Sequence, residues 1–215
     1  QEGCDKRPPS SLIKHRKPAE QEITELKISA GEFKGRKLSS AKALRFVKKR
    51  DELRPTSSKV KESIFNIVGE KIKGAEFVDL YAGTGAVGME AMSRGAKMVF
   101  FVEAAGKRAE LIKDMLKDCG CFERADIAKS KASDFIKNAS ENNLKFDIIF
   151  LDPPYYGKEL ESALSLLADG ALLDEEGIVI AEHTSKKKLP DEIGRLVKKK
   201  DYKYGDTMLT LFRKV

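Results

Sequence analysis

The sequence has no tryptophan and only two histidines, His15 and His183, among its 215 residues. Catalytic triads and most transition-metal sites use histidine as a base or a ligand, so this scarcity argues against both kinds of chemistry. Cysteine is also scarce: Cys4, Cys119 and Cys121 form an odd set, and two of them are separated by one position. That spacing fits neither a disulfide framework nor a tetrahedral metal site. We therefore expect free thiols, a reducing cytosol and no metal centre.

Long apolar runs are absent as well. No run approaches the ~20 residues that a membrane-spanning helix needs, and residues 1–22 lack the apolar middle of a signal peptide. Hydrophobic residues make up 41% of the chain and charged residues 35%, a balance typical of a globular protein with a heavily charged surface. The length suits one α/β domain with a small appendage. We expect a cytoplasmic protein without membrane contacts.

Positive charge is concentrated near the start of the chain. Residues 1–61 contain 17 Lys or Arg and 8 Asp or Glu, whereas residues 62–215 contain 24 and 26. Such an excess is the electrostatic footprint of a segment that binds a polyanion, although a solvated basic tail has the same composition. The candidate phosphate-binding residues are Lys34, Arg36, Lys37, Arg45, Lys48, Lys49, Arg50 and Arg54.

Hydrophobic periodicity divides the chain into three parts. Residues 1–24 are polar, contain three prolines and show no periodicity, which predicts a disordered or loosely packed extension. Residues 25–53 contain two short alternating runs, 25–29 and 33–38, which predict a small basic β-hairpin. Residues 54–215 alternate between strand and helix patterns, which predicts a parallel sheet with crossover helices.

In the third part, a helix is expected to begin at Thr56 or Ser57 and to end near residues 69–74. Strands are expected near 75–80, 98–102, 125–130, 146–151, 177–182, 196–203 and 206–213, the last two joined at Gly205-Asp206. Crossover helices are expected near 86–94, 107–118, 132–140 and 158–168.

The strand expected at 146–151 stops at the sequence Asp152-Pro153-Pro154-Tyr155. Two prolines cannot continue a strand or enter a helix interior, so they form a rigid corner at the carboxyl edge of the sheet, where open α/β folds bind ligands. The corner offers a carboxylate at Asp152, a backbone carbonyl at Pro153 and a ring at Tyr155. These groups suit a planar base with an exocyclic amine, because the oxygens accept its hydrogens while the ring stacks on the base. The alternative is an ordinary turn that ends a strand.

A glycine-rich bend follows the first core strand. Gly83, Gly85 and Gly88 fit the G-x-G-x-x-G pattern of dinucleotide-binding loops, and Glu103, twenty residues after Gly83, is placed to bind ribose hydroxyls. Asp79 ends the strand, however, and its charge there would repel a pyrophosphate and attract a cationic amino-acid cofactor. The bend therefore favours a cationic cofactor over a dinucleotide.

Residues 79–85 (Asp-Leu-Tyr-Ala-Gly-Thr-Gly) resemble motif I of class I methyltransferases. Residues 152–155 resemble the (Asn/Asp/Ser)-Pro-Pro-(Tyr/Phe) motif of enzymes that methylate amino groups of nucleic acids. The resemblance implies S-adenosylmethionine rather than NAD. It also implies the α/β, Rossmann-like class I fold, with a seven-stranded, mostly parallel sheet and helices on both faces, here extended by the N-terminal hairpin.

The cofactor-binding residues that the resemblance implies are Asp79, Tyr81, Ala82, Gly83, Thr84, Gly85, Glu103, Ala132 and Ser133, with Thr56 at the cofactor's edge. Lys131 stands where families with this architecture often have Asp or Asn, so we assign the adenine contact to the backbone of Ala132 or to Ser133.

The similarity then narrows to one family, the RsmD-type enzymes that methylate a guanine amine in small-subunit ribosomal RNA. Residues 28–38, 54–66 and 85–96 are similar to three of its signatures, in the family's order. Membership implies S-adenosylmethionine-dependent methyl transfer to guanine N2, with 16S ribosomal RNA or a partly assembled small subunit as partner and with the basic residues above binding RNA. We expect a monomer. The implied catalytic residues are Asp152, Pro153, Pro154 and Tyr155.

Two other functions remain open at this point. A DNA or RNA adenine-N6 methyltransferase shares the Asp-Pro-Pro-Tyr motif, although 61 residues before the core leave little room for a target-recognition region. A catalytically silent RNA-binding ribosome assembly factor would keep the same fold. Against it, the candidate acidic and glycine positions of both motifs are intact.

Overall fold

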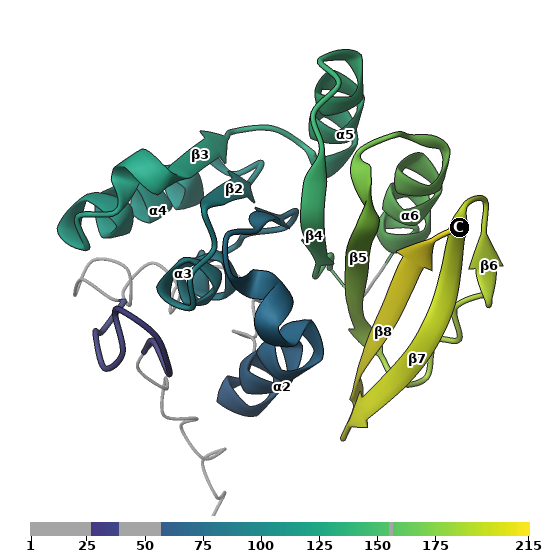
Figure 1. Cartoon of the computed structure of the whole chain (residues 1–215), viewed down its shortest axis with the longest axis horizontal. Helices are drawn as coiled ribbons and strands as arrows, with labels where there is room; N and C mark the ends of the chain where they lie inside the picture. The colour runs from purple at the N-terminus through teal and green to yellow at the C-terminus, as the bar shows by residue number, and fades with distance from the viewer. Residues whose placement is uncertain (1–26, 39–56, 155–156) are drawn as a thin grey trace, which may run out of the picture.

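The apolar run at 146–151 forms strand β4 in the middle of the sheet, as its sequence predicts. The structure, a computed structural model, describes residues 27–38, 57–154 and 157–215. Within these ranges one sheet of eight strands has helices on both faces (Figure 1). No helix in them is both long and apolar enough to cross a bilayer.

Five parallel strands and three antiparallel ones make up the sheet, in the order β3-β2-β1-β4-β5-β8-β7-β6. The parallel strands are β1 (Glu76–Asp79), β2 (Met98–Val102), β3 (Ala125–Ala128), β4 (Phe146–Leu151) and β5 (Leu173–Thr184). The antiparallel strands are β6 (Glu192–Ile193), β7 (Leu196–Tyr204) and β8 (Thr207–Lys214). The predicted seven strands are confirmed, and the two-residue strand β6 is an addition at the edge.

The helices lie where the periodicity predicts them. One face of the sheet packs against α2 (Ser58–Val68), the 3-10 turn η1 (Gly69–Ile72), α3 (Ala86–Ser93) and α4 (Gly106–Asp118). The other face packs against α5 (Ala132–Glu141) and α6 (Glu159–Asp169). A second 3-10 turn, η2 (Phe122–Arg124), leads into β3. The predicted class I architecture is confirmed.

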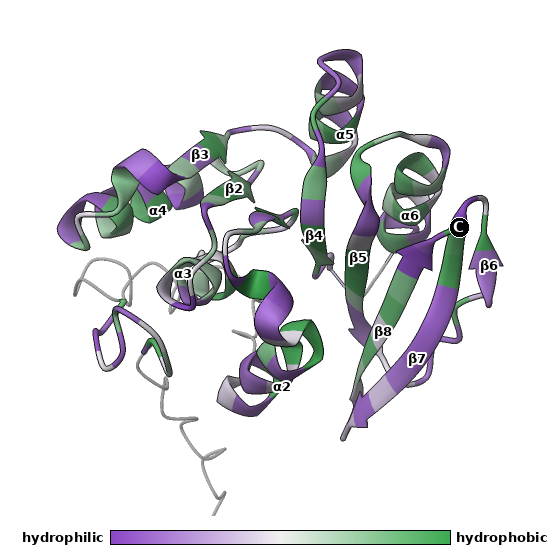
Figure 2. Ribbon diagram, viewed as in Figure 1, coloured by the Kyte–Doolittle hydropathy of each residue, from purple (hydrophilic) through white to green (hydrophobic). Residues whose placement is uncertain are grey.

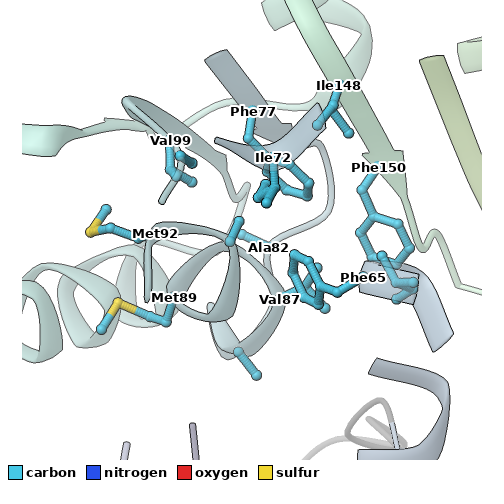
Figure 3. Close-up of a cluster of buried hydrophobic side chains, with 14 of the residues drawn as sticks. Phe65, Ile72, Phe77, Ala82, Val87, Met89, Met92, Val99, Ile148 and Phe150 are labelled. Atoms are coloured by element: carbon cyan, nitrogen blue, oxygen red, sulfur yellow. The ribbon is translucent and has the colours of Figure 1, made fainter. Parts of the chain in front are cut away.

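Alternation along each strand sends side chains into two separate cores. In β4, Ile148 and Phe150 belong to the core under α2, α3 and α4, whereas Ile149 and Leu151 belong to the core under α5 and α6. Figure 3 shows the first core, in which Phe65 of α2 packs toward the sheet. The inner strands are green along much of their length in Figure 2, as strands covered on both faces should be.

Helix α2 begins at Ser57, one of the two predicted caps. The Ser57 hydroxyl accepts a hydrogen bond from the Val60 N–H at 3.2 Å, which satisfies one of the otherwise unpaired amides of the first turn. The other predicted cap, Thr56, lies outside the described residues.

Residues 27–38 form a short hairpin-like segment against the first core. Its ladder is reduced to one bridge, between Lys27 and Lys37, and Phe33 lies in the turn rather than in the predicted second strand. The reason is that Phe33, with Ile28 and Leu38, is buried in the core, so packing overrides the alternating pattern. The predicted boundaries at 24 and 53 fall outside the described residues and stay predictions.

Candidate active site

The end of β1 and the bend after it form one wall of the site. Asp79, the last residue of β1, is buried, and its Oδ2 accepts the Gly88 N–H at 3.0 Å. The bend closes with a hydrogen bond of 2.6 Å from the Gly85 N–H to the Ala82 carbonyl. Helix α3 starts directly after Gly85, so the bend connects the carboxyl edge of the sheet to a helix N-terminus.

Gly88 has a packing role that explains the third glycine of the pattern. A Cβ added there would lie 2.3 Å from the ring of Phe101 in β2. Only glycine lets α3 approach the sheet this closely, and this approach brings the Gly88 N–H to Asp79.

Glu103 follows the last residue of β2, as predicted, and it braces the bend. Its carboxylate accepts the Gly83 N–H at 3.0 Å and the Ala105 N–H at 2.7 Å, and it pairs with the Arg108 guanidinium at 2.9 Å. Because two carboxylate oxygens have about four acceptor positions, Glu103 can still accept from a hydroxyl.

The acidic side chains of this edge influence one another. Burial raises the pKa of Asp79 to about 7, against the lowering effect of the Gly88 hydrogen bond, and the charges of Asp152 and Glu103 push it in the same upward direction. These three carboxyl groups come from the ends of three adjacent strands, β2, β1 and β4. The arrangement resists a further anion and favours a cation.

The corner after β4 lies at the same edge. Phe150 pairs with Asp79 across β4 and β1, and Asp152 follows two residues later, half-buried, with Pro153 buried and Pro154 exposed. Tyr155 lies outside the described residues. The structure thus brings the corner and the bend together, which is the juxtaposition that the sequence predicts.

The remaining predicted cofactor residues surround this edge. Tyr81, Gly83 and Thr84 are half-buried, and Ala82 is buried. Burial and the nearby charge of Glu159, at the start of α6, raise the pKa of Tyr81 to about 12. Ala132 and Ser133 begin α5, the helix that follows β3, so they too lie at the carboxyl edge.

The described basic residues of the N-terminal segment lie elsewhere. Arg36 donates to the Cys119 carbonyl at 3.1 Å, just past the end of α4. A crossover helix starts at the carboxyl edge of the sheet and ends at the opposite edge, and α4 is ~20 Å long. Arg36 therefore lies near the opposite edge, about one helix length from the glycine bend. Lys34 and Lys37 are exposed on the same short segment. The other predicted phosphate contacts, Arg45, Lys48, Lys49, Arg50 and Arg54, lie outside the described residues.

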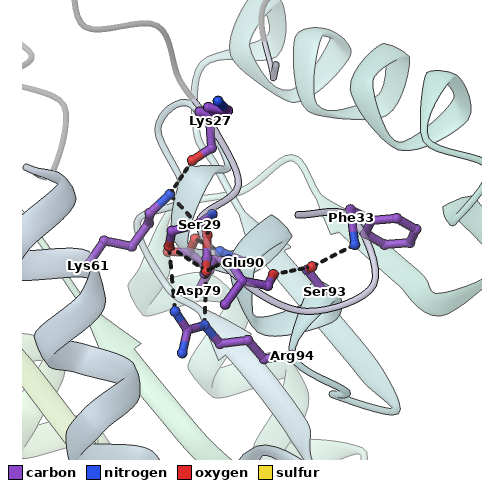
Figure 4. Close-up of polar contacts among 10 residues, drawn as sticks. Lys27, Ser29, Phe33, Lys61, Asp79, Glu90, Ser93 and Arg94 are labelled. Atoms are coloured by element: carbon purple, nitrogen blue, oxygen red, sulfur yellow. Dashed lines mark hydrogen bonds and ion pairs between the residues drawn. The ribbon is translucent and has the colours of Figure 1, made fainter. Parts of the chain in front are cut away.

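A buried polar cluster, missed by the sequence analysis, fixes this segment to α3 (Figure 4). Glu90 of α3 is fully buried and pairs with Lys61 at 3.1 Å and with Arg94 at 2.9 Å. Its oxygens also accept the backbone N–H and the hydroxyl of Ser29, at 2.8 and 2.7 Å, and the Ala30 N–H at 3.0 Å. One signal was available: Glu90 is the one charged residue in the apolar sequence of α3, residues 86–93.

The cluster sets the charge state of Glu90. Burial alone would raise the pKa of Glu90, but the hydrogen bonds from Ser29 and the charge of Lys61 outweigh it, and the pKa lies below its ordinary value. Ser93, one turn later, accepts the Phe33 N–H at 2.9 Å and donates to the Ala30 carbonyl at 2.6 Å. The N-terminal segment is therefore attached by charge as well as by apolar packing.

Metal ligation has no support in the described part of the chain, where no group of three or more His, Cys, Asp or Glu residues is arranged to hold an ion. Fold and site together define a class I methyltransferase: a mostly parallel sheet with a glycine bend after β1 and a diproline corner after β4. The solved "Putative methyltransferase yhhF" of Escherichia coli superimposes with a TM-score of 0.75 at 25% identity, over 88% of this chain and 98% of that one.

Sequence comparison gives the family. The family described as "Conserved hypothetical protein 95" matches residues 26–213, and this chain belongs to it. "Ribosomal RNA small subunit methyltransferase D" of Haemophilus influenzae is 36% identical over 166 residues, which cover 77% of this chain and 82% of that protein. "Putative rRNA methyltransferase YlbH" of Bacillus subtilis is 34% identical over 189 residues, covering 88% of this chain and 99% of that protein. The predicted RsmD-type relationship is confirmed.

Proposed function

We propose that the protein transfers the methyl group of S-adenosylmethionine to the exocyclic N2 amine of a guanine in 16S ribosomal RNA. The observation that carries the proposal is the meeting of Asp79, Glu103 and Asp152 at one edge of the sheet, beside the glycine bend. The relatives named as ribosomal RNA methyltransferases support the substrate class.

The cofactor fits the electrostatics of this edge. S-adenosylmethionine supplies a methyl group activated on a positively charged sulfur. Burial disfavours the ionised form of Asp79, and repulsion by the charges of Asp152 and Glu103 disfavours it further. A nearby cation offsets this repulsion and favours the ionised form. Asp79 and the bend from Tyr81 to Gly85 would hold the amino-acid end, and Glu103 would accept from ribose hydroxyls. Ala132 and Ser133 would contact the adenine, and Thr56 the outer edge.

The corner would orient the amine. The Asp152 carboxylate and the Pro153 carbonyl accept the two hydrogens of the guanine N2 amine, which directs the nitrogen lone pair at the methyl carbon. Pro154 would keep the corner rigid, and Tyr155 would stack on the base. Once the methyl group that the cofactor supplies had been transferred to this nitrogen, Asp152 or water would take the proton that the amine loses. Because no bond forms to the protein, most of the rate comes from positioning.

RNA would extend from the corner to the N-terminal segment, whose described basic residues lie about one helix length away, near the end of α4. Residues 25–53 would follow the phosphate backbone through Lys34, Arg36, Lys37 and the basic residues that lie outside the described ranges. The cluster around Glu90 supports this role, since it fixes the start of that segment to α3. With ribosomal RNA as its substrate, the protein would act in the cytoplasm, as a single copy.

Methyl transfer in vitro tests the proposal. The purified protein is incubated with methyl-labelled S-adenosylmethionine and either 16S ribosomal RNA transcribed in vitro or small subunits from a strain without the gene. Labelled N2-methylguanosine after complete nuclease digestion is the expected product, and Asp152→Ala, which should form it far more slowly, is the control. Label in N6-methyladenosine, or no label in either substrate, would contradict the proposal.

A further inference from the structure

Charge is distributed in three blocks rather than two. Residues 185–215 contain ten Lys or Arg and four Asp or Glu, whereas residues 62–184 contain 14 and 22. The sum over residues 62–215 conceals a second basic region at the end of the chain. It comprises the turn after β5 and the hairpin of β7 and β8.

This second basic region reaches the edge of the sheet that carries Asp152. Strand β5 runs parallel to β4, so the turn that follows Thr184 starts at the carboxyl edge. The hairpin tip lies at the same place, because Thr207 pairs with both Thr184 and Tyr204. The Ser185 N–H donates to the Asp206 carbonyl at 2.7 Å and ties the turn to the tip. Figure 1 shows the end of β5 and the tip of β7 and β8 at the same end of the sheet.

Part of the positive charge there is not neutralised by neighbouring acids. Lys187 pairs with Glu161 at 2.6 Å. Lys186, Lys188 and Lys203 are exposed and form no ion pair with any residue in the described ranges. We refer to these three lysines as the edge triad. Strand β7 is hydrophilic along most of its length in Figure 2.

The two tyrosines of β7 lie on the opposite face of the strand from Lys203, because successive side chains of a strand alternate. Tyr202 and Tyr204 are half-buried on β7, and the Lys200 ammonium lies 4.9 Å from the centre of the Tyr202 ring. Both tyrosines pack against the first core, so the positive charge of the edge triad, rather than an aromatic platform, is the feature that suits a phosphate backbone.

Protection of an edge strand is the competing explanation. Strand β6 pairs only with Leu196 and Val197, so the rest of β7 is an open edge, and lysines on such edges oppose aggregation. That explanation covers Lys203 but not Lys186 and Lys188, which lie in the turn after β5.

We propose that the edge triad forms a second RNA-binding surface, which holds the phosphate backbone on the side of Asp152 opposite the bend that binds the cofactor. The strand order supports this placement: β5, β8 and β7 follow β4 on one side, whereas β1 and β2 lie on the other. The surface rests on the proposed function in that its ligand is the RNA substrate. It adds a contact that the basic N-terminal segment does not provide.

The test is RNA affinity as a function of salt. The triple variant Lys186→Gln, Lys188→Gln, Lys203→Gln is compared with wild type by fluorescence anisotropy, on a fragment of 16S ribosomal RNA transcribed in vitro. The slope of log K against log salt is negative, and each lost phosphate contact reduces its magnitude by about 0.7–0.9. The loss of three contacts should therefore reduce the magnitude by about 2. If the variant and wild type bind equally well at 1 M salt, the variant should bind roughly 100-fold more weakly than wild type at ~0.1 M salt. Any difference already present at 1 M salt is subtracted first.

A matched control isolates position from total charge. Lys71, Lys97 and Lys137 are also exposed, and the first two lie just before β1 and β2, at the opposite edge of the sheet. Their triple Gln variant should keep the wild-type slope, and both variants should bind S-adenosylmethionine as wild type does. An unchanged slope in the edge variant, whether or not it aggregates more readily, overturns the proposal, as does an equal loss in both variants.

The experiment distinguishes failure of the second RNA-binding surface from failure of the proposed methyl transfer. Binding is measured without turnover, so the slopes are informative even if wild type methylates no RNA. Wild-type methylation combined with equal slopes in all three proteins would overturn the second surface alone.

Discussion

Cofactor affinity should rise steeply with pH, because one buried carboxyl group must ionise first. With the pKa of Asp79 raised to about 7 by burial and by the charges of Asp152 and Glu103, most molecules at acidic pH offer the cofactor a neutral side chain. The ionised fraction rises from about 3% at pH 5.5 to about 50% at pH 7.0. The apparent Kd for S-adenosylmethionine should therefore fall about 15-fold over this range.

Calorimetric titration in two buffers of different ionisation enthalpy measures the affinity and the proton release together. The chosen range lies below the ordinary pKa of an α-amino group, about 7.7–8.0, so the cofactor keeps its charge. At pH 7.0 binding should release about half a proton per chain as Asp79 becomes fully ionised. An affinity that does not change between pH 5.5 and 7.0, without proton release, would refute the reasoning.

Two variants separate the cause from its neighbours. Asp152→Asn removes one of the charges that raise the pKa of Asp79, so the rise in affinity should occur at lower pH. Asp79→Asn should bind weakly and independently of pH. The contribution of Asp79 to stability has the opposite pH dependence. Since the raised pKa favours the protonated form in the folded protein, the free energy of unfolding of the cofactor-free protein, measured relative to Asp79→Asn, should fall as pH rises from 3.8 to about 7.

Four other predictions concern single features. Glu90→Ala should lower the free energy of unfolding in urea by about 3–5 kcal/mol, because Lys61 is left buried without its partner, and Glu90→Gln should lower it less; equal, small losses would argue against a buried pair. Gly88→Ala should lower both the Tm and the cofactor affinity, since its Cβ would lie 2.3 Å from the Phe101 ring; wild-type values would contradict this. Asp152→Ala should lower kcat about 100-fold at pH 8 with a KM for the cofactor within a few-fold of wild type, because the amine loses an acceptor, whereas parallel losses in both would point to the cofactor site. Light scattering should give the mass of one chain, and a dimer would contradict the expected monomer.

The fold was predictable because its signals are local. The apolar run 146–151, the alternation before Gly205 and the spacing of apolar residues in α4 and α5 each reflect burial on one or two faces. The meeting of bend and corner was also predictable, because parallel strands share one carboxyl edge.

Features that depend on distant contacts were not predictable. Ser29 and Glu90 are 61 positions apart, and no local pattern tells which buried acid an N-terminal hydroxyl will reach. The turn around Phe33 followed the core rather than the alternation of its own segment. The second basic region was hidden because the acidic middle of the chain cancels its charge in any sum over the whole core.

The central claim is that the corner at Asp152 presents a guanine amine to the cofactor at the carboxyl edge. Mass spectrometry of digested 16S ribosomal RNA from a strain without the gene, complemented with wild type or with Asp152→Ala, tests it most directly. We predict that one N2-methylguanosine is missing from the deletion strain, and that the wild-type gene restores it while the variant does not. An unchanged N2-methylguanosine content in the deletion strain, or full restoration by Asp152→Ala, would contradict the account.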